Sequence, residues 1–578
     1  MQKNHENSLQ AALKACKGAF ISVGVFSLFV NALMLVPTFY MLQVYGRVLT
    51  SNNVTTLVML TIIMSILVIT SGTLEWVRSR IMVRVSTKLD VLLSRHVYKA
   101  SFKRALESGG MDASVQPMND LTSLRQFLTG NGVFAFFDAP WLPIYIAVMF
   151  MFHPYYGWVA IASAIVLLIL AYANEKVTGK ALGEANKENI AATLNTTKNL
   201  RNAEVIESMG MLDTLIARWS QRQRKVLLLQ SNASDKGGVV STLSKTFRSW
   251  VQSLILGLGA YLAIQHEINA GLVIAGSVLL GRALAPIDLI IGSWKGFISA
   301  RTQYNRLNDI LDKMHAEPQR MPLPAPKGNI QVEHLIIGAP GSMTPILKGI
   351  GFGVPAGAVV GIIGPSASGK STLARALMGV WAPQHGSVRL DGADLHQWDK
   401  ELLGPHIGYL PQDIELFEGS ISENIARFAT IDPEKVVQAA QIAGVHEMIL
   451  LLPEGYDTVI GSDGVNLSGG QRQRIGLARA LYGIPKVILL DEPNSNLDEV
   501  GERALAHAIQ YLKQAGSTVF VITHRTSILS QLDRLLVMQN GAITMYGPRD
   551  QVMEELNKQQ LAAQKQAQVS AGTAQAGA

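Results

Sequence analysis

Long apolar runs constrain the fold of this chain more than any other feature of its sequence. Crossing the hydrocarbon layer of a bilayer takes about 20 mostly apolar residues. Six stretches are long and apolar enough: residues 19–42, 56–74, 131–152, 155–174, 249–265 and 270–293, with approximate bounds. Because a membrane offers no partners for free backbone groups, each stretch is expected to form an α-helix.

The remaining sequence divides the chain into unlike parts. Residues 1–18 are polar and are predicted to be a cytoplasmic N-terminus, and residues 19–310 an all-α six-helix transmembrane domain. Residues 325–556 have the composition of an ordinary α/β domain, and the Ala-, Gln- and Gly-rich residues 557–578 are predicted to be a disordered tail. The expected fold class is therefore multi-domain, with a helical membrane part followed by an α/β part.

The distribution of basic residues sets the orientation of the six spans. The short links after spans 1, 3 and 5 contain a single Lys or Arg, Arg47, whereas the other side carries many. Since cytoplasmic loops are enriched in Lys and Arg, both termini and both long loops are expected in the cytoplasm. This topology also accounts for the net charge of +7. No basic stripe is interleaved with aromatic residues, so the expected partner is membrane lipid and not nucleic acid.

The two long loops, residues 75–130 and 175–248, are amphipathic at helical spacing and are expected to extend the spans into the cytoplasm. Their tips, near Ser108–Asn119 and Arg201–Met211, are predicted to contact the α/β domain. A proline at Glu204 is expected to break the second tip, at about 3 kcal/mol or more.

Three charged residues fall inside predicted spans: Asp138, Arg282 and Asp288. Charges are costly in the membrane and often mark function, but they also occur in structural ion pairs or near the interface. The sequence leaves these readings open.

A phosphate-binding loop follows the short apolar strand expected at residues 358–363. The pattern is GxxxxGK[ST] between a strand and a helix, the context that a Walker A loop requires. Its glycines let backbone N–H groups approach phosphates, Lys370 is expected to neutralise phosphate charge, and the Ser371 hydroxyl is expected to ligate Mg²⁺. The predicted ATP-binding residues are Gly364, Pro365, Ser366, Ala367, Ser368, Gly369, Lys370, Ser371 and Thr372.

Two acidic residues end a second buried strand, residues 487–491. Asp491 is placed to help hold Mg²⁺, and Glu492 is placed to act as the general base for the attacking water. His524 ends another apolar strand and is predicted to contact the γ-phosphate.

A second glycine-containing helix start is formed by Ser468, Gly469, Gly470 and Gln471. Helix N-termini favour anions, yet one nucleotide needs only one phosphate loop. We therefore expect this segment to bind ATP held by a partner's Walker A loop, which requires two copies of the chain.

Together these motifs resemble the ABC ATPases, and the resemblance extends over nearly the whole chain. It adds Gln412 as a catalytic residue that senses Mg²⁺ and the γ-phosphate, so the expected Mg²⁺ ligands are Ser371, Gln412 and Asp491. It also identifies residues 495–498, which end at Asp498, as the loop that follows the catalytic carboxylate. ATP and Mg²⁺ are the implied cofactors.

The membrane half resembles the inner-membrane ABC component of type I secretion systems, through residues 36–57, 136–146, 201–211 and 292–307. Residues 491–498 and 478–483 point to the branch that exports metalloproteases. The resemblance implies an ATP-hydrolysing homodimer in the bacterial inner membrane. It further implies a periplasmic membrane-fusion (adaptor) protein, an outer-membrane channel protein, and a secreted, unfolded protein substrate with a C-terminal signal.

Two positions depart from the pattern of these families. Ala339 stands where many ABC proteins have an aromatic residue that stacks on adenine, and Gly46 stands where an acidic residue is expected. Two alternatives remain open: a lipid or drug exporter with the same six-helix plan, and an ABC channel or regulator without sustained hydrolysis. The presence of Glu492 and His524 argues against the second.

Overall fold

A computed structural model describes residues 8–110, 113–313, 322–340, 342, 344–461 and 467–559, with only the backbone of residues 526 and 527. The chain forms two compact units. One consists of Met1–Ala105 and Asp112–His315, and the other of Leu106–Met111 and Ala316–Ala578. Residues 551–559 are helical, so the predicted tail, residues 557–578, begins within a helix. The rest of that tail, from residue 560, lies outside the described residues.

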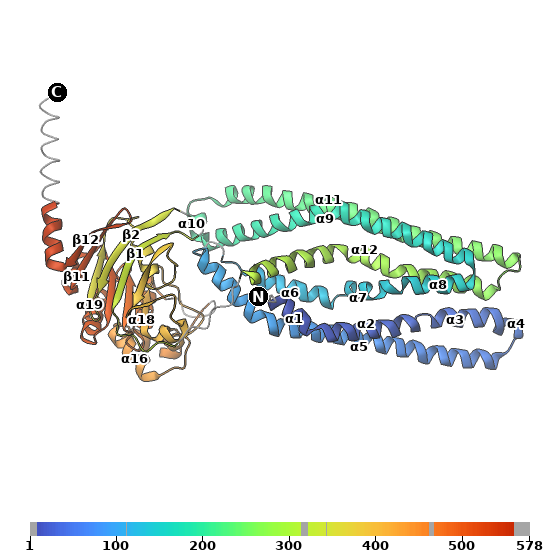
Figure 1. Cartoon of the computed structure of the whole chain (residues 1–578), viewed down its shortest axis with the longest axis horizontal. Helices are drawn as coiled ribbons and strands as arrows, with labels where there is room; N and C mark the ends of the chain where they lie inside the picture. The colour runs from blue at the N-terminus through green and yellow to red at the C-terminus, as the bar shows by residue number, and fades with distance from the viewer. Residues whose placement is uncertain are drawn as a thin grey trace, which may run out of the picture. The chain divides into compact units, whose positions relative to one another are not determined.

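The first unit is helical (Figure 1). Its helices are α1 (Ser8–Ala15), α2 (Lys17–Leu33), α3 (Val36–Gln43), α4 (Leu49–Ser51), α5 (Val54–Glu107), α6 (Gln116–Thr129), α7 (Asn131–Asp138), α8 (Leu142–Phe152), α9 (Pro154–Arg201), α10 (Ala203–Ser208), α11 (Leu212–Ile264) and α12 (Ala270–Asp312). Within the described residues, six helical segments are long and apolar enough to cross a membrane: Lys17–Ser51, Val54–Glu107, Asn131–Phe152, Pro154–Arg201, Leu212–Ile264 and Ala270–Asp312. The prediction of six long apolar helices is confirmed, and the bounds of the membrane spans within them stay a prediction.

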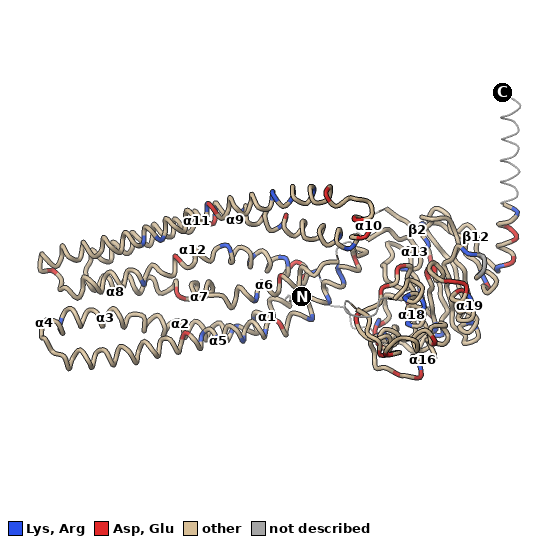
Figure 2. Tube along the Cα trace, turned by 180° about the vertical axis from the view of Figure 1, so that it is seen from behind, with Lys and Arg blue, Asp and Glu red and all other residues tan. Residues whose placement is uncertain are grey.

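Several spans continue as helix well beyond their apolar stretch. α5 has 54 residues, α9 has 48 and α11 has 53, and at about 1.5 Å per residue each is far longer than a bilayer is thick. α9 and α11 lie side by side (Figure 1). Charged residues gather toward the α6 and α10 end of the helical unit, whereas the α3, α4 and α8 end has few (Figure 2). This distribution agrees with long helical extensions on the basic side of the membrane.

Two of the three charged residues predicted inside spans, Asp138 and Asp288, have charged partners in the helical unit. Asp138 accepts hydrogen bonds from Arg78 at 2.9 Å and from Asn31 at 2.7 Å. Asp288 pairs with Arg248 of α11 at 2.9 Å. These contacts are those of structural ion pairs, one of the readings that the sequence left open.

Small residues allow close packing where α9, α11 and α12 meet. The Tyr156 ring is fully buried, and an ideal Cβ on Gly276 would lie 2.3 Å from its Cε2 atom. An ideal Cβ on Gly259 would lie 2.3 Å from the Tyr156 hydroxyl. α11 and α12 can approach Tyr156 because Gly259 and Gly276 have no side chain.

Gly46 lies in a π-helical turn, Val44–Val48, where its Cβ would be 3.5 Å from the Asn269 side chain.

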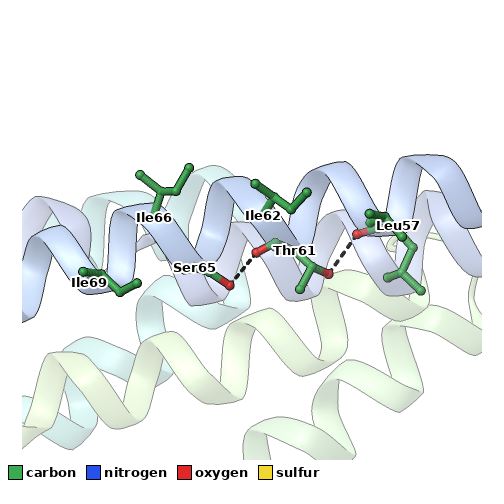
Figure 3. A pocket seen from close by; sticks show the side chains of 7 residues that line it. Leu57, Thr61, Ile62, Ser65, Ile66 and Ile69 are labelled. Atoms are coloured by element: carbon green, nitrogen blue, oxygen red, sulfur yellow. Dashed lines mark hydrogen bonds between the residues drawn. The ribbon is translucent and has the colours of Figure 1, made fainter.

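The apolar stretch of α5 differs from the other spans because none of it is buried within the described chain. A shallow groove runs along it, lined by Leu57, Val58, Thr61, Ile62, Ser65, Ile66 and Ile69 (Figure 3). The two hydroxyls bond back to their own helix, from Thr61 to the Leu57 carbonyl at 2.8 Å and from Ser65 to the Thr61 carbonyl at 2.7 Å. With its polar groups satisfied, this face is suited to an apolar environment.

The second unit is an α/β domain built on two main sheets. Its strands are β1 (Ile330–Gly338), β2 (Pro345–Val354), β3 (Val359–Ile363), β4 (His385–Leu390), β5 (Ala393–Asp394), β6 (Ile407–Leu410), β7 (Gly419–Ser420), β8 (Val459–Ile460), β9 (Val487–Asp491), β10 (Thr518–Ile522), β11 (Arg534–Gln539) and β12 (Ala542–Pro548). Its helices are α13 (Lys370–Leu377), α14 (Lys400–Leu403), α15 (Ile421–Ile425), α16 (Pro433–Ile442), α17 (His446–Leu450), α18 (Gly469–Leu481) and α19 (Glu499–Gln514).

The larger sheet has the strand order β12-β11-β3-β10-β9-β6. Within this sheet, β11, β3, β10, β9 and β6 run parallel to one another. A separate antiparallel sheet has the strand order β2-β1-β4-β5. β9 and β10 are buried at every position, which is typical of parallel strands covered on both faces. Because parallel strands end at the same edge, residues that follow β3, β6, β9 and β10 come together there. The predicted combination of a six-helix membrane domain and an α/β domain is confirmed.

Candidate functional site

The loop between β3 and α13 forms the phosphate-binding part of the site. Gly369 has φ +99°, a left-handed conformation that favours glycine, and an ideal Cβ on Gly364 would lie 2.2 Å from the Met538 carbonyl oxygen. Lys370 begins α13, and its ammonium donates to the carbonyls of Gly364 and Pro365, both at 2.9 Å. Burial lowers the pKa of Lys370, while the nearby carboxylates Glu492 and Asp491 oppose that shift. The loop therefore holds a cation at the start of a helix, a combination that binds phosphate.

Asp491 ends β9 beside this loop. Its side chain is buried, and burial together with the neighbouring Glu492 raises the pKa of Asp491, partly offset by a hydrogen bond with Ser371. Within the described chain, the Asp491 Oδ1 atom is buried and has no hydrogen-bond partner. A hydroxyl beside an unpartnered carboxylate oxygen is a donor set that fits Mg²⁺. Ser371 and Asp491 are thus the residues that would hold the metal.

Glu492 is the point where three strand ends converge. Gln412, after β6, donates from its amide to one Glu492 carboxylate oxygen at 3.3 Å. The His524 Nε2 atom, after β10, lies 3.5 Å from the other oxygen. Glu492 itself has φ +49°, and its N–H donates to the Ile522 carbonyl at 3.0 Å. A non-glycine residue in this conformation is strained, and such strain is concentrated at functional sites.

The predicted partner-binding segment caps α18. The Ser468 hydroxyl accepts from the Gln471 N–H at 3.2 Å, and the Gln471 side chain accepts from the Ser468 N–H at 2.8 Å. An ideal Cβ on Gly470 would lie 2.9 Å from the Asn496 carbonyl oxygen, so a glycine is needed there. Within the described part of the chain, the two hydrogen bonds of this capping box join Ser468 and Gln471 and do not reach the Walker A loop. The helix start lies instead beside residues that follow Glu492.

Gln473 is a residue of this site that sequence reasoning missed. It lies one turn into α18 with only 2% of its surface exposed. Its amide nitrogen donates to the Pro493 carbonyl at 2.5 Å, and its amide oxygen accepts from the Asn496 N–H at 2.9 Å. A polar residue at a buried helical position was the available signal. Gln473 fastens the helix that begins at Ser468 to the segment that begins at Glu492.

Arg427 is a second missed residue. Within the described residues, its guanidinium donates to five backbone carbonyls, those of Arg479, Gly404, Ile407, Ala480 and Tyr482. Two of these acceptors end α18 and one begins β6, so Arg427 joins the helix after Ser468 to the strand before Gln412. Burial lowers the pKa of Arg427 to about 10, a value that leaves it charged at neutral pH and able to stabilise the C-terminus of α18.

Comparison with known proteins agrees with this geometry. Residues 347–495 match the ABC transporter family, and residues 20–285 match the ABC transporter transmembrane region. The chain also superimposes on a bacterial Atm1-family ABC exporter with ATP bound, with a TM-score of 0.82 at 22% identity, covering 95% of this chain and 98% of the other. Fold and site together define an ABC transporter, with six membrane-spanning helices and an ATPase domain.

Sequence relatives narrow the class. The chain is 44% identical over 551 residues to the type I secretion system ATP-binding protein PrsD of Rhizobium meliloti (strain 1021), covering 95% of each protein. It is 29% identical over 547 residues to the leukotoxin translocation ATP-binding protein LktB of Mannheimia haemolytica, covering 93% of this chain and 77% of that protein. The chain therefore belongs to the ATP-binding proteins of type I secretion systems, and it is a multi-pass membrane ATPase that drives protein export.

Proposed function

We propose that two copies of this chain form a homodimer in the bacterial inner membrane, with both termini and the ATPase domains in the cytoplasm. Hydrolysis of ATP there drives an unfolded protein across the envelope. A periplasmic adaptor and an outer-membrane channel complete the path. The cargo class that we propose is a metalloprotease or related protein with a C-terminal secretion signal.

The observation that carries the proposal is the convergence of Gln412 and His524 on the Glu492 carboxylate, beside Lys370 and Asp491. In the proposed step, a water oxygen bonds to the γ-phosphorus while the bond to the β–γ bridging oxygen breaks. Glu492 accepts the water proton, and Lys370 and the loop N–H groups stabilise phosphate charge. Mg²⁺, when bound at Ser371 and Asp491, supplies charge neutralisation of the phosphates. Gln412 is proposed to link this metal site to Glu492.

The helix start at Ser468, which Gln473 connects to the segment after Glu492, supports the proposed dimer. Ser468, Gly469, Gly470 and Gln471 form an anion-binding helix start that the chain's own Walker A loop makes redundant. We propose that they bind ATP held by the other copy, so that two ATP molecules are enclosed by two chains related by twofold symmetry. The exposed apolar face of α5 would contact membrane lipid.

The cargo proposal is supported by the two relatives, whose names refer to type I secretion and to leukotoxin translocation. The test is secretion in a bacterial host that expresses the chain with an adaptor, a channel and the proteins encoded beside its gene. We expect one of those proteins in the medium with the native chain and none with Lys370→Ala. Movement of a fluorescent lipid or drug by the purified chain, without any secreted protein, would instead favour an exporter of small molecules.

A further inference from the structure

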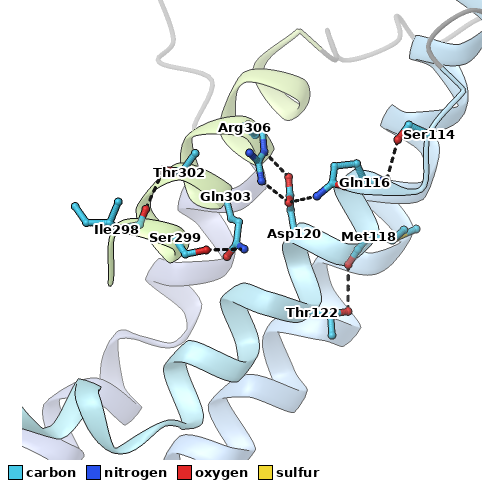
Figure 4. A network of polar contacts seen from close by, with 10 residues as sticks. All are labelled: Ser114, Gln116, Met118, Asp120, Thr122, Ile298, Ser299, Thr302, Gln303 and Arg306. Atoms are coloured by element: carbon cyan, nitrogen blue, oxygen red, sulfur yellow. Dashed lines mark hydrogen bonds and ion pairs between the residues drawn. The ribbon is translucent and has the colours of Figure 1, made fainter. Parts of the chain in front are cut away.

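An ion pair with a buried carboxylate joins two helices of the membrane unit that are distant in sequence. Asp120 of α6 receives two hydrogen bonds from Arg306 of α12: Nε to Oδ2 at 2.8 Å, and Nη2 to Oδ1 at 2.6 Å (Figure 4). Gln116, one turn earlier on α6, donates to Oδ1 at 2.8 Å. The side chain of Asp120 is 2% exposed and that of Arg306 is 26% exposed. Such a two-point contact fixes the orientation of the partners as well as their distance.

Buried leucines lie next to both partners of the pair in the sequence. Leu121 and Leu124 of α6, and Leu307 and Leu311 of α12, belong to one buried cluster that also includes residues of α1 and α5. Desolvating two charges is expensive, and leaving one of them unpaired is more so. Apolar side chains could hold these helices together without that penalty. The charged pair is therefore better explained by a need for one defined register between α6 and α12.

The pair lies close to both places where the chain passes between its two compact units. α6 begins at Gln116, shortly after Leu106–Met111, a segment that groups with the ATPase unit. α12 ends at Asp312, shortly before that unit resumes at Ala316. Asp120 and Arg306 are thus a direct link between two of the chain's routes from the ATPase into the spans.

We propose that Asp120 and Arg306 are positioning residues that keep α6 and α12 together as one rigid joint throughout the transport cycle. Through this joint, motion delivered along either route reaches span 3 and span 6 in a fixed relation. The proposal rests on the proposed export function and adds to it the residues that couple ATP hydrolysis to transport. The hydrogen bonds described for Asp120 and Arg306 all lie within the helical unit, so we expect basal hydrolysis not to depend on the pair.

A second ion pair on the same helix provides a matched control. Arg125 of α6 pairs with Asp90 of α5 at 2.6 Å, but its partners are 31% and 38% exposed. The two arginines are similarly exposed, but the Asp90 carboxylate is half-exposed whereas that of Asp120 is buried. Because water can solvate Asp90 when its partner is lost, this pair is expected to be dispensable. The test compares Asp120→Asn and Arg306→Gln with Asp90→Asn and Arg125→Gln. Each full-length variant is purified and its basal ATP turnover measured, and cargo secreted by cells is measured per molecule of membrane-inserted protein.

We expect Asp120→Asn and Arg306→Gln to lower secretion by about tenfold, an effect typical of positions that couple distant sites. Basal ATP turnover should stay within about twofold of the native chain, as should both readouts of the control variants. Normal secretion by the Asp120→Asn and Arg306→Gln variants would overturn the proposal. Absence of secretion from the native chain would instead overturn the export function on which the proposal rests.

A cross-linking experiment separates a rigid joint from simple stabilisation. Cys16 is the only cysteine, so a Cys16→Ser chain carrying Asp120→Cys and Arg306→Cys offers one reactive pair and leaves no unpaired buried charge. We expect secretion to be low before treatment of cells with a short, membrane-permeable, thiol-reactive cross-linker and to recover after it. Treatment of the Cys16→Ser parent alone should change nothing. No recovery, or a further loss after cross-linking, would show that α6 and α12 do not act as a permanently closed joint.

Discussion

Replacing Gln473 with alanine tests whether the connection between α18 and the segment that begins at Glu492 is needed for ATP hydrolysis. The substitution removes the donor to the Pro493 carbonyl and the acceptor of the Asn496 N–H. The bond to Pro493 is buried, and a buried backbone group left without a partner costs about 1–3 kcal/mol. Adding the lost bond to Asn496, which water can replace in part, gives about 2–4 kcal/mol of lost stability.

Stability alone does not distinguish a functional tether from ordinary packing, so a matched buried amide is needed. Asn424 is also fully buried, and it donates to the carbonyls of Phe417 at 2.8 Å and Ser420 at 3.0 Å. We expect Asn424→Ala and Gln473→Ala to lower the thermal unfolding midpoint of the purified chain by similar amounts. Only Gln473→Ala should also reduce ATP turnover, by about tenfold or more, because displacement of a catalytic group of this kind is costly. Equal turnover in the two variants would refute this role of Gln473.

Three further outcomes follow from the site and the helical unit. Mixing Lys370→Ala with Ser468→Arg chains should restore part of the ATPase activity that each variant lacks alone. In a mixed dimer both substitutions fall in one composite site, which leaves the other site intact. No recovery despite proven mixing would argue against such sites. The structure places Glu204 in the first turn of α10, where proline is tolerated. Ile206→Pro is the better disruption, because it removes the N–H that donates to the Asn202 carbonyl at 3.1 Å. Secretion should fall while basal ATP hydrolysis persists, and normal secretion would exclude α10 from coupling. Gly276→Ala should lower the unfolding midpoint more than Gly292→Ala, since only the first Cβ would meet a neighbouring ring, that of Tyr156; equal midpoints would contradict that packing.

The membrane spans and the nucleotide motifs could be predicted because each depends on local sequence. Span length and charge bias are properties of single segments, as between Val54 and Glu107. The Walker A loop, Asp491 and Glu492 could be placed together because parallel strands deliver their following residues to one sheet edge. The resemblance to the ABC components of type I secretion systems then predicted the family that the sequence relatives confirm.

Contacts between distant residues could not be predicted from one sequence. Asp120 and Arg306 are separated by 186 positions, and nothing in their neighbourhoods indicates a pairing. Arg427 has the sequence character of an ordinary surface residue, yet its guanidinium binds carbonyls from three elements. The expectation for Glu204 was wrong in detail because the start of α10 could not be located from amphipathic spacing alone.

The proposed composite ATPase depends most directly on Glu492 as the general base. Glu492→Gln keeps the size of the side chain but removes the basic carboxylate, which typically lowers turnover by about 10²–10⁴-fold. The decisive measurement is nucleotide retention beside turnover in the purified chain, with Lys370→Ala for comparison. We predict that Glu492→Gln retains uncleaved ATP and stops secretion, whereas Lys370→Ala also loses nucleotide binding. ATP hydrolysis by Glu492→Gln at the native rate would contradict the role given to Glu492.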